Sequence, residues 1–353
     1  MKKIVVAPDS FKGSLTSAEV ADAVERGIKD VFPQCNVVKA GVADGGEGTV
    51  EAIVKAVGGA MYAASVTDPL GRPIKAAYGI VRSGGVKTAV MEMSAASGLP
   101  LLLPDELNPW ITSTYGTGEM ISDALNRGCR KFLVGIGGSA TNDAGTGMLS
   151  ALGVRFLDSR GQRLKGCGKD LESIARIDMS SLIPAARESE FIVACDVNTP
   201  FCGPDGAARV FAPQKGANPQ TTEALDRGMR SFAQVIAGQF QTDIVPLSGA
   251  GAAGGLGGAF KAFLNARLTA GIEMVLDAIA FDSLLEGASL VITGEGRIDA
   301  QTAAGKTAAG VLRHAARKGI PVIAIGGSVA MCRELKRDGI YRHIFHHKRS
   351  GEP

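Results

Sequence analysis

Polar residues gather where short apolar runs give way to turns, and the first such group stands near the N-terminus. The stretch APDSFKGS follows the apolar run 4–7 and contains Asp9, Ser10 and Lys12. A carboxylate, a hydroxyl and an ammonium can together bind a hydroxy acid or a phosphate. A plain turn between a strand and a helix is the alternative for this loop taken alone.

A glycine-rich loop in the middle of the chain has the composition of an anion site. The stretch GIGGSATNDAGTG, residues 135–147, follows an apolar run and precedes a helical pattern. Backbone N–H groups at such a helix start can bind an anion, and neighbouring hydroxyls add donors. The candidate binding residues of this loop are Gly137, Gly138, Ser139, Thr141 and Asn142.

Two other loops supply carboxylates in pairs. ADGGEGT contains Asp44 and Glu47, and the later stretch GEGRIDAQTAAGK contains Glu295 and Asp299. The helix dipole also favours carboxylates at a helix start, so each loop alone has a structural explanation. Several such loops in one chain are hard to attribute to turn chemistry alone.

A carboxylate and a lysine mark the stretch FIVACDVNTPFCGPDGAARVFAPQKGA. Asp196 comes directly after an apolar run, and Lys215 lies where the stretch ends. Such a carboxylate can take a proton from a substrate hydroxyl, while a cation stabilises a transferring phosphoryl group. The alternative is an Asx turn at Asp196 and a solvated Lys215.

Two motifs resemble known nucleotide-binding loops. AQTAAGKT ends like a P-loop, but Ala300 stands where the first glycine is required, which excludes that motif. GAGAAG, residues 249–254, matches GxGxxG, follows the apolar stretch DIVPLS and has Glu273 about twenty residues further on. It favours a rival hypothesis, an NAD(P)-dependent dehydrogenase of a small hydroxy acid. Close packing of a helix on a sheet is the structural alternative.

Composition excludes several classes of protein. The 38 Lys and Arg residues nearly balance the 35 Asp and Glu residues, so neither nucleic acid nor an anionic membrane is an expected partner. No apolar run is long enough to cross a membrane, and the six cysteines form no CxxC pair, as in a reduced cytoplasmic protein. Of four histidines, only His314 precedes the last eleven residues, and we expect it to be a partly exposed structural residue. A general base is therefore expected to be a carboxylate.

The elements that must position these residues alternate between strand and helix. Apolar runs, each followed by a polar loop and a helical pattern, predict helices over 17–31, 49–57, 146–152, 306–318 and 329–337. Residues 68–93 differ, because they predict two strands joined near Ser83, Gly84 and Gly85 in a hairpin. We therefore predict an α/β protein with one domain formed by 1–68 and 275–353, into which a mixed α/β domain, 69–274, is inserted.

Taken together, eight stretches resemble the bacterial glycerate kinase family. They span residues 7 to about 328 in order: APDSFKGS, VADGGEGT, DPLGR, STYGTGE, GIGGSATNDAGTGM, CDVNTPFCGPDGAARVFAPQKGA, GAGAAGGLG and VITGEGRIDAQTAAGK. The resemblance implies transfer of the ATP γ-phosphate to D-glycerate with Mg²⁺, giving 2-phosphoglycerate. It also implies a Rossmann-like domain that carries a second α/β domain.

The resemblance gives the candidate residues expected roles. Asp9, Ser10 and Lys12 are expected to line the substrate site. Nucleotide phosphates are expected to be bound by Gly137, Gly138, Ser139, Thr141 and Asn142. Asp196 is expected to be the base. Two pairs of carboxylates are the alternative candidates for metal ligands: Asp44 with Glu47, or Glu295 with Asp299. Arg72 and Lys215 are expected to stabilise charge. A homo-oligomer is a further expectation. The alternative from another class is a non-catalytic protein that binds anions.

The C-terminal segment departs from the family pattern. After VIAIGGS the chain reads MCRELKRDGIYRHIFHHKRSGEP, in place of a further strand and a helix. We expect the last eleven residues to form a solvated tail, and a shortened terminus to leave apolar surface uncovered.

Overall fold

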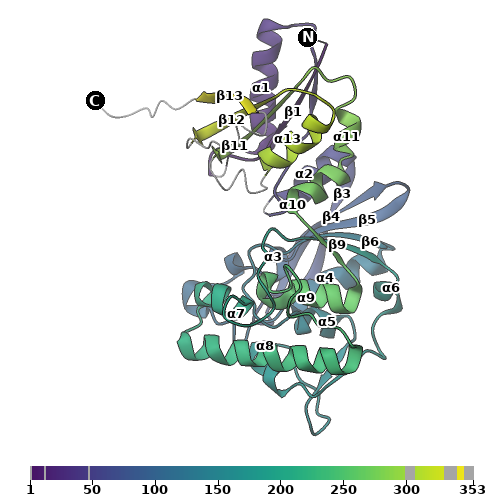
Figure 1. Cartoon of the computed structure of the whole chain (residues 1–353). Coiled ribbons are helices and arrows are strands. Elements are labelled where there is room, and N and C mark those ends of the chain that lie inside the picture. The colour runs from purple at the N-terminus through teal and green to yellow at the C-terminus, as the bar shows by residue number, and fades with distance from the viewer. Residues whose placement is uncertain (1, 12, 47, 299–306, 330–339, 346–353) are drawn as a thin grey trace. The chain divides into compact units, whose positions relative to one another are not determined.

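The computed structural model describes the chain except residues 1, 12, 47, 299–306, 330–339 and 346–353 (Figure 1). Its contacts define two compact units, residues 1–58 with 270–353, and residues 59–269. The predicted boundaries at 68/69 and 274/275 stay a prediction about domains. Among the described residues, no helix is both long and apolar enough to cross a membrane.

The first unit contains a parallel sheet in the order β13-β12-β11-β1-β2. Its strands are β1 (Lys3–Pro8), β2 (Asn36–Lys39), β11 (Leu290–Ile298), β12 (Val322–Val329) and β13 (Ile340–Phe345). β1 lies between β11 and β2, and its apolar residues are buried, as expected for a central strand of a parallel sheet.

The helices of the first unit begin near the polar loops of the sequence. They are α1 (Ser17–Val31), α2 (Thr49–Val57), α10 (Gly271–Ala278), α11 (Phe281–Leu284) and α13 (Thr307–Arg317). The start of α1 is fixed by a capping box, in which Glu19 N–H donates to Thr16 Oγ1 and Thr16 N–H donates to Glu19 Oε2.

The second unit contains a mixed sheet in the order β10-β9-β6-β5-β4-β3 and a small antiparallel pair, β7 with β8. The strands are β3 (Gly59–Thr67), β4 (Pro73–Ser83), β5 (Val86–Glu92), β6 (Lys131–Gly135), β7 (Arg155–Leu157), β8 (Arg176–Asp178), β9 (Glu190–Ala194) and β10 (Arg267–Thr269). The predicted hairpin is confirmed: β4 and β5 are joined by Gly84 and Gly85, whose positive φ angles suit a two-residue turn.

Helices pack around this sheet, and the longest is α8 (Figure 1). The α-helices are α3 (Ser94–Ser97), α4 (Tyr115–Asn126), α5 (Thr146–Ala151), α6 (Pro184–Arg187), α7 (Ala207–Phe211), α8 (Pro219–Phe240) and α9 (Ala252–Leu264). Four short 3₁₀ helices complete the unit: η1 (Leu99–Leu101), η2 (Pro104–Glu106), η3 (Gly168–Ser173) and η4 (Pro213–Lys215).

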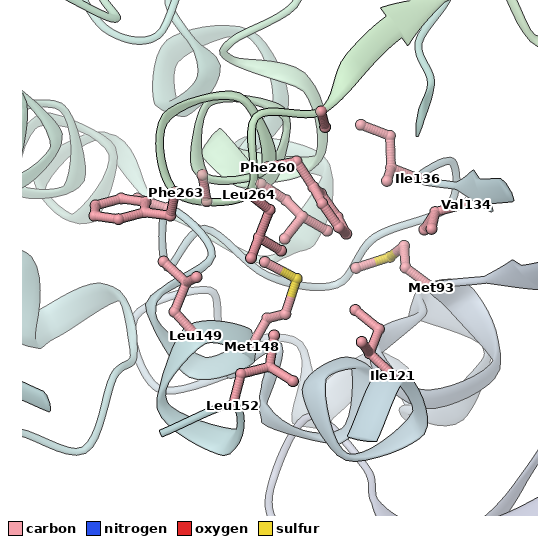
Figure 2. Close-up of a cluster of buried hydrophobic side chains, with 14 of the residues drawn as sticks. Met93, Ile121, Val134, Ile136, Met148, Leu149, Leu152, Phe260, Phe263 and Leu264 are labelled. Carbon is pink, nitrogen blue, oxygen red and sulfur yellow. The ribbon is translucent and has the colours of Figure 1, made fainter. Parts of the chain in front are cut away.

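One large apolar core fills the second unit. Figure 2 shows Phe260 and Leu264 of α9 facing Met148 of α5, with Met93 and Ile136 beside them. These side chains come from segments on both sides of the glycine-rich loop. The loop is therefore seated on a packed core.

Three expectations need correction. DIVPLS, residues 243–248, contains no strand, because the segment forms turns. His314 is buried and not partly exposed as expected, and its ring is hydrogen-bonded to Glu273 and Asp282. The predicted tail is wrong for residues 343–345, which end strand β13 beside β12. Most of the helix predicted over 329–337 lies outside the described residues.

Candidate active site

Residues 136–145, which we call the glycine loop, connect β6 to α5. The loop leaves β6 at the edge of the sheet where β5 and β9, which are parallel to β6, also end. Leu99 N–H donates to Gly138 O at 2.9 Å, which ties the loop to η1. Gly137 and Gly138 are exposed, whereas Ser139, Thr141 and Asn142 are buried. The structure thus brings the five candidate phosphate-binding residues together in one loop.

Asp143 is a buried carboxylate that organises the glycine loop. Its Oδ2 accepts hydrogen bonds from Thr114 N at 2.7 Å, Thr114 Oγ1 at 2.8 Å and Gly147 N at 3.2 Å, and its Oδ1 accepts one from Gly145 N at 3.0 Å. Burial raises the pKa of Asp143, and these four hydrogen bonds oppose that rise. Asp143 therefore joins the starts of α4 and α5.

Lys215 is buried against the same loop. Its Nζ donates to Ser139 Oγ at 2.6 Å and to Thr141 O at 2.7 Å. Burial lowers the pKa of Lys215 to about 7, while the charge of Asp143 acts in the opposite direction. The alternative of a solvated Lys215 is therefore wrong.

The end of β9 carries Asp196 at the same sheet edge as the glycine loop. Ala194 pairs with Gly135 in the parallel register, so Asp196 and Gly137 each follow their paired strand end by two residues. Asp196 is exposed. A carboxylate near a loop that can hold phosphate is where a base for a substrate hydroxyl is needed.

Arg72 is held by carboxylates. Its guanidinium forms ion pairs with the buried Asp68 and with Glu106, the latter at 2.6 Å, and also contacts Leu101 O. Asp68 further accepts the N–H groups of Leu70 and Arg72 in the turn after β3. The structure therefore places Arg72 in a tight ion-pair network, and its predicted role in charge stabilisation stays a prediction.

In the first unit, Asp9 lies where β1 ends. Its Oδ1 accepts from Ser10 N and its Oδ2 from Thr307 Oγ1, both at 2.6 Å, so Asp9 links the end of β1 to the start of α13. The buried Glu295 lies on β11, directly after Gly294, which pairs with Pro8. Two carboxylates thus lie on neighbouring chain segments of this sheet, Asp9 directly after β1 and Glu295 within β11.

Asp44 lies in the loop between β2 and α2. It is half-buried, and its Oδ1 accepts from Gly46 N at 3.1 Å. A Cβ on Gly271 would come within 1.9 Å of Asp44 O, so this loop packs closely on the start of α10. Lys12, Glu47 and Asp299 lie outside the described residues.

The comparison with known families decides the assignment. Residues 4–350 match the model of the glycerate kinase family. The chain belongs to the glycerate kinase family. It is 47% identical to a glycerate kinase of Bacillus subtilis, over 97% of this chain and 88% of that protein. It is 46% identical to a glycerate 2-kinase of Escherichia coli, over 93% and 85% of the two chains.

A solved structure in this family has the same fold. A crystal structure from Salmonella typhimurium LT2 that bears the name glycerate kinase 2 matches with a TM-score of 0.90. The identity is 46%, and the match covers 98% of this chain and 91% of that one. The family resemblance and the α/β fold expected from the sequence are both confirmed.

The GAGAAGGLG stretch has a packing role in this glycerate kinase fold. A Cβ on Gly254 would lie 2.2 Å from Thr141 O, and one on Gly255 would lie 2.8 Å from Ala144 Cα. Gly254 also has a φ of +66°, and its carbonyl accepts from Ala144 N at 2.9 Å. The described residues directly before the motif, 241–248, form no strand, so the strand-to-helix context of a dinucleotide site is missing, and the dehydrogenase alternative has no support.

Sequence reasoning missed the organising role of Asp143. The signal was present, because an aspartate followed by glycines at a helix start commonly accepts backbone N–H groups. It also missed that Glu273, considered as a cofactor ligand, pairs with His314 and Arg313. Contacts between distant segments, which spacing does not reveal, create both arrangements.

Few carboxylates of the described chain are candidates for binding Mg²⁺. Within the part of the chain that the structure describes, no three His, Cys, Asp or Glu residues gather to hold a metal ion. Mg²⁺ often binds through one or two carboxylates together with substrate phosphates and water. Asp44, in the loop between β2 and α2, and the buried Glu295, on β11, have the right donor chemistry for such a site.

Proposed function

We propose that the protein is a glycerate 2-kinase, which transfers the γ-phosphate of ATP to D-glycerate and forms 2-phosphoglycerate and ADP. The observation that carries this proposal is the 46–47% identity, over 93–97% of the chain, to proteins named glycerate kinase and glycerate 2-kinase.

The loops suggest a division of roles. In the second unit, Gly137, Gly138 and Ser139 would bind phosphate oxygens of ATP, because Gly137 and Gly138 are exposed and Ser139 follows them directly. Thr141 and Asn142 would support the same loop. Asp196 would accept the proton of the glycerate hydroxyl as its oxygen attacks phosphorus.

The carboxylates of the first unit would serve the metal and the substrate. Asp44 with Glu47, or Glu295 with Asp299, would hold Mg²⁺. When bound, Mg²⁺ supplies positive charge that offsets the negative charge of the phosphates. Asp9 and Ser10 would orient the substrate, with Lys12 as the cation, and Arg72 and Lys215 would stabilise charge.

The chemistry of the substrates and of the thiols supports a cytoplasmic location as part of this proposal. The five cysteines that the structure describes are free thiols, which persist in a reducing compartment. ATP as a substrate favours the same compartment, the cytoplasm. Assembly into a homo-oligomer and the lack of a nucleic-acid partner stay predictions from the sequence.

One experiment tests the class and the substrate together. ADP release is measured with a coupled assay across a panel of small hydroxy acids, with and without Mg²⁺. Activity with D-glycerate that requires Mg²⁺ is expected, and phosphorus NMR of the product identifies the modified hydroxyl. No ADP release with any acid in the panel contradicts the proposed function.

A further inference from the structure

Lys215 places a buried ammonium group beside a hydroxyl of the glycine loop. The side chain of Lys215 is 1% exposed, and its Nζ contacts Ser139 Oγ at 2.6 Å and Thr141 O at 2.7 Å. An ammonium has three hydrogens and no lone pair, so it can only donate. Ser139 Oγ must therefore accept from a charged Lys215.

This constraint fixes what the Ser139 hydroxyl can do. Since its oxygen accepts from Lys215, its own hydrogen must point to another acceptor. Ser139 follows the exposed Gly137 and Gly138 and is itself 6% exposed, whereas Lys215 approaches from the interior. The hydroxyl hydrogen is therefore left for an acceptor other than Lys215.

Two more polar atoms of the loop are buried without a hydrogen-bond partner among the described residues, Thr141 Oγ1 and Asn142 Oδ1. An unpaired buried polar atom costs about 1–3 kcal/mol. Buried polar atoms of this kind are found at functional sites, where a ligand or an ordered water supplies the missing partner. This second observation points to a ligand independently of Lys215.

The charged groups around Lys215 are few. Asp143, on the glycine loop, is the charged residue that acts on Lys215. Arg209 lies on α7, which packs against η4, and is paired with Glu223 and Asp226. Burial and Asp143 therefore set the charge state of Lys215.

We propose that Lys215 is a positioning residue for substrate binding: its ammonium turns the Ser139 hydroxyl outward, so that Ser139 donates to an anionic oxygen of a substrate. The anion is a phosphate of ATP or the carboxylate of glycerate, so the proposal rests on the proposed function. Lys215 acts through Ser139 and need not touch the substrate.

The arrangement makes anion binding depend on pH. When Lys215 loses its proton, the neutral amine can accept from Ser139, and the hydroxyl hydrogen turns inward. The local positive charge is lost as well. Affinity for the anion therefore falls as the pH rises through the pKa of Lys215, which burial lowers to about 7.

The test measures KM for ATP and KM for glycerate separately, from about pH 6 to about pH 9, across the titration of Lys215. In the parent protein we expect one of the two KM values to rise with pH. In Ser139→Ala and Lys215→Met, that KM is about tenfold higher or more at low pH, the worth of a hydrogen bond to a charged group. In Lys215→Met it no longer varies with pH, and in Ser139→Ala, which keeps the titrating ammonium, its rise with pH is smaller than in the parent. The affected substrate identifies the anion.

Two further variants separate positioning from structure. Lys261 is an exposed lysine on α9, and Lys261→Met should keep the parent profile for both substrates. Lys215→Arg keeps its charge at every pH of the assay, so it should bind the anion without the pH dependence. Thermal unfolding of each variant identifies any that fails to fold, in which case Ser139→Ala carries the test.

The outcomes are distinct from those for the proposed function. Parent-like KM values and pH profiles for both substrates in Ser139→Ala overturn the positioning role, even where ADP release with glycerate supports the kinase. If no hydroxy acid supports ADP release, calorimetry with ADP tests the anion site alone. ADP affinity that falls with pH in the parent and falls less steeply in Ser139→Ala supports the role, and equal profiles overturn it.

Discussion

At the scale of single residues, the exposed carboxylate after β9 is the simplest to test. Asp196→Asn keeps the shape of the side chain and removes its basicity. If Asp196 takes the glycerate proton, kcat should fall by about a hundredfold or more, with a small change in the KM for ATP. Steady-state kinetics with saturating Mg²⁺ measure both values.

A neighbouring carboxylate provides the control for this substitution. Asp205 is exposed in the loop that follows β9, and Asp205→Asn removes a similar charge from the same region. We expect its kcat to match the parent within about twofold, as for a substitution at a solvated site. A kcat for Asp196→Asn within about tenfold of the parent would rule out Asp196 as the base.

Single residues were predicted well where their neighbours in sequence decide their role. Thr16 and Glu19 stand three residues apart, which is the spacing of a capping box, and they cap α1 with the two reciprocal hydrogen bonds that this spacing predicts. The burial of Lys215 was left open and the role of Asp143 was missed, because their partners lie on other segments. A residue's burial depends on tertiary packing, which local spacing does not determine.

At the scale of elements, the contact between α9 and the glycine loop predicts the effect of a single methyl group. Gly254→Ala places a Cβ 2.2 Å from Thr141 O and forces alanine to a φ of +66°. We expect the free energy of unfolding to fall by roughly 2 kcal/mol or more. Because the displaced residue belongs to the glycine loop, the KM for ATP should rise too.

Gly238 on α8 is the matched site for this prediction. A Cβ there meets nothing within 4 Å, and the residue has helical geometry. Gly238→Ala should leave KM unchanged and raise stability by up to about 1 kcal/mol. Denaturant unfolding compares the two variants, and equal stabilities for them would contradict the packing role of GAGAAGGLG.

His314 joins three helices and gives the first unit a pH-dependent contact. Its Nδ1 pairs with Asp282 of α11 at 2.8 Å and its Nε2 with Glu273 of α10 at 3.0 Å. Burial lowers the pKa of His314, but these hydrogen bonds outweigh burial, so the pKa is raised above its ordinary value. Stability from the charged ring is therefore complete below the unfolded pKa and is lost as the pH rises through the folded one.

The measurement is the melting temperature against pH. In the parent it should decline above about pH 6.5, the ordinary pKa of histidine, and His314→Gln should flatten this decline. Arg313→Gln removes the ion pair with Glu273, at 2.7 Å, without a group that titrates in this range. The melting temperature of Arg313→Gln should therefore lie below that of the parent by the same amount at each pH. Parallel curves for the parent and His314→Gln would exclude the histidine contact.

Periodicity identified the long elements and failed on short or irregular ones. The predicted helices over 17–31 and 49–57 match α1 and α2 as the structure has them. DIVPLS was considered as a strand, but Pro246 cannot donate to a ladder and the segment turns. Strands of three residues, such as β7 and β10, are too short to produce a period.

At the scale of the whole molecule, the two units differ in how the chain builds them. The buried core of the second unit draws only on residues between 64 and 266, one continuous stretch. The first unit needs both ends of the chain, because β1 pairs with β11. Pairing of distant segments pays a larger loop-closure entropy and slows folding.

We therefore expect the second unit to fold first after dilution from denaturant. Pulse-labelling hydrogen exchange should find amides of β6 and β9 protected before those of β1 and β11. Simultaneous protection of all four strands would show a single cooperative step. Residues 59–269 expressed alone should also unfold cooperatively, which near-ultraviolet circular dichroism can follow.

The place of β1 between β2 and β11 has a consequence during synthesis on the ribosome. Ala7 O accepts from Thr293 Oγ1, 286 residues later in the chain. At roughly 5–20 residues per second, the edge of β1 that meets β11 waits about 15–60 s for its partner. During that time the apolar residues 4–7 lack the neighbouring strand β11. We therefore expect chaperones that bind short apolar segments to bind the nascent chain.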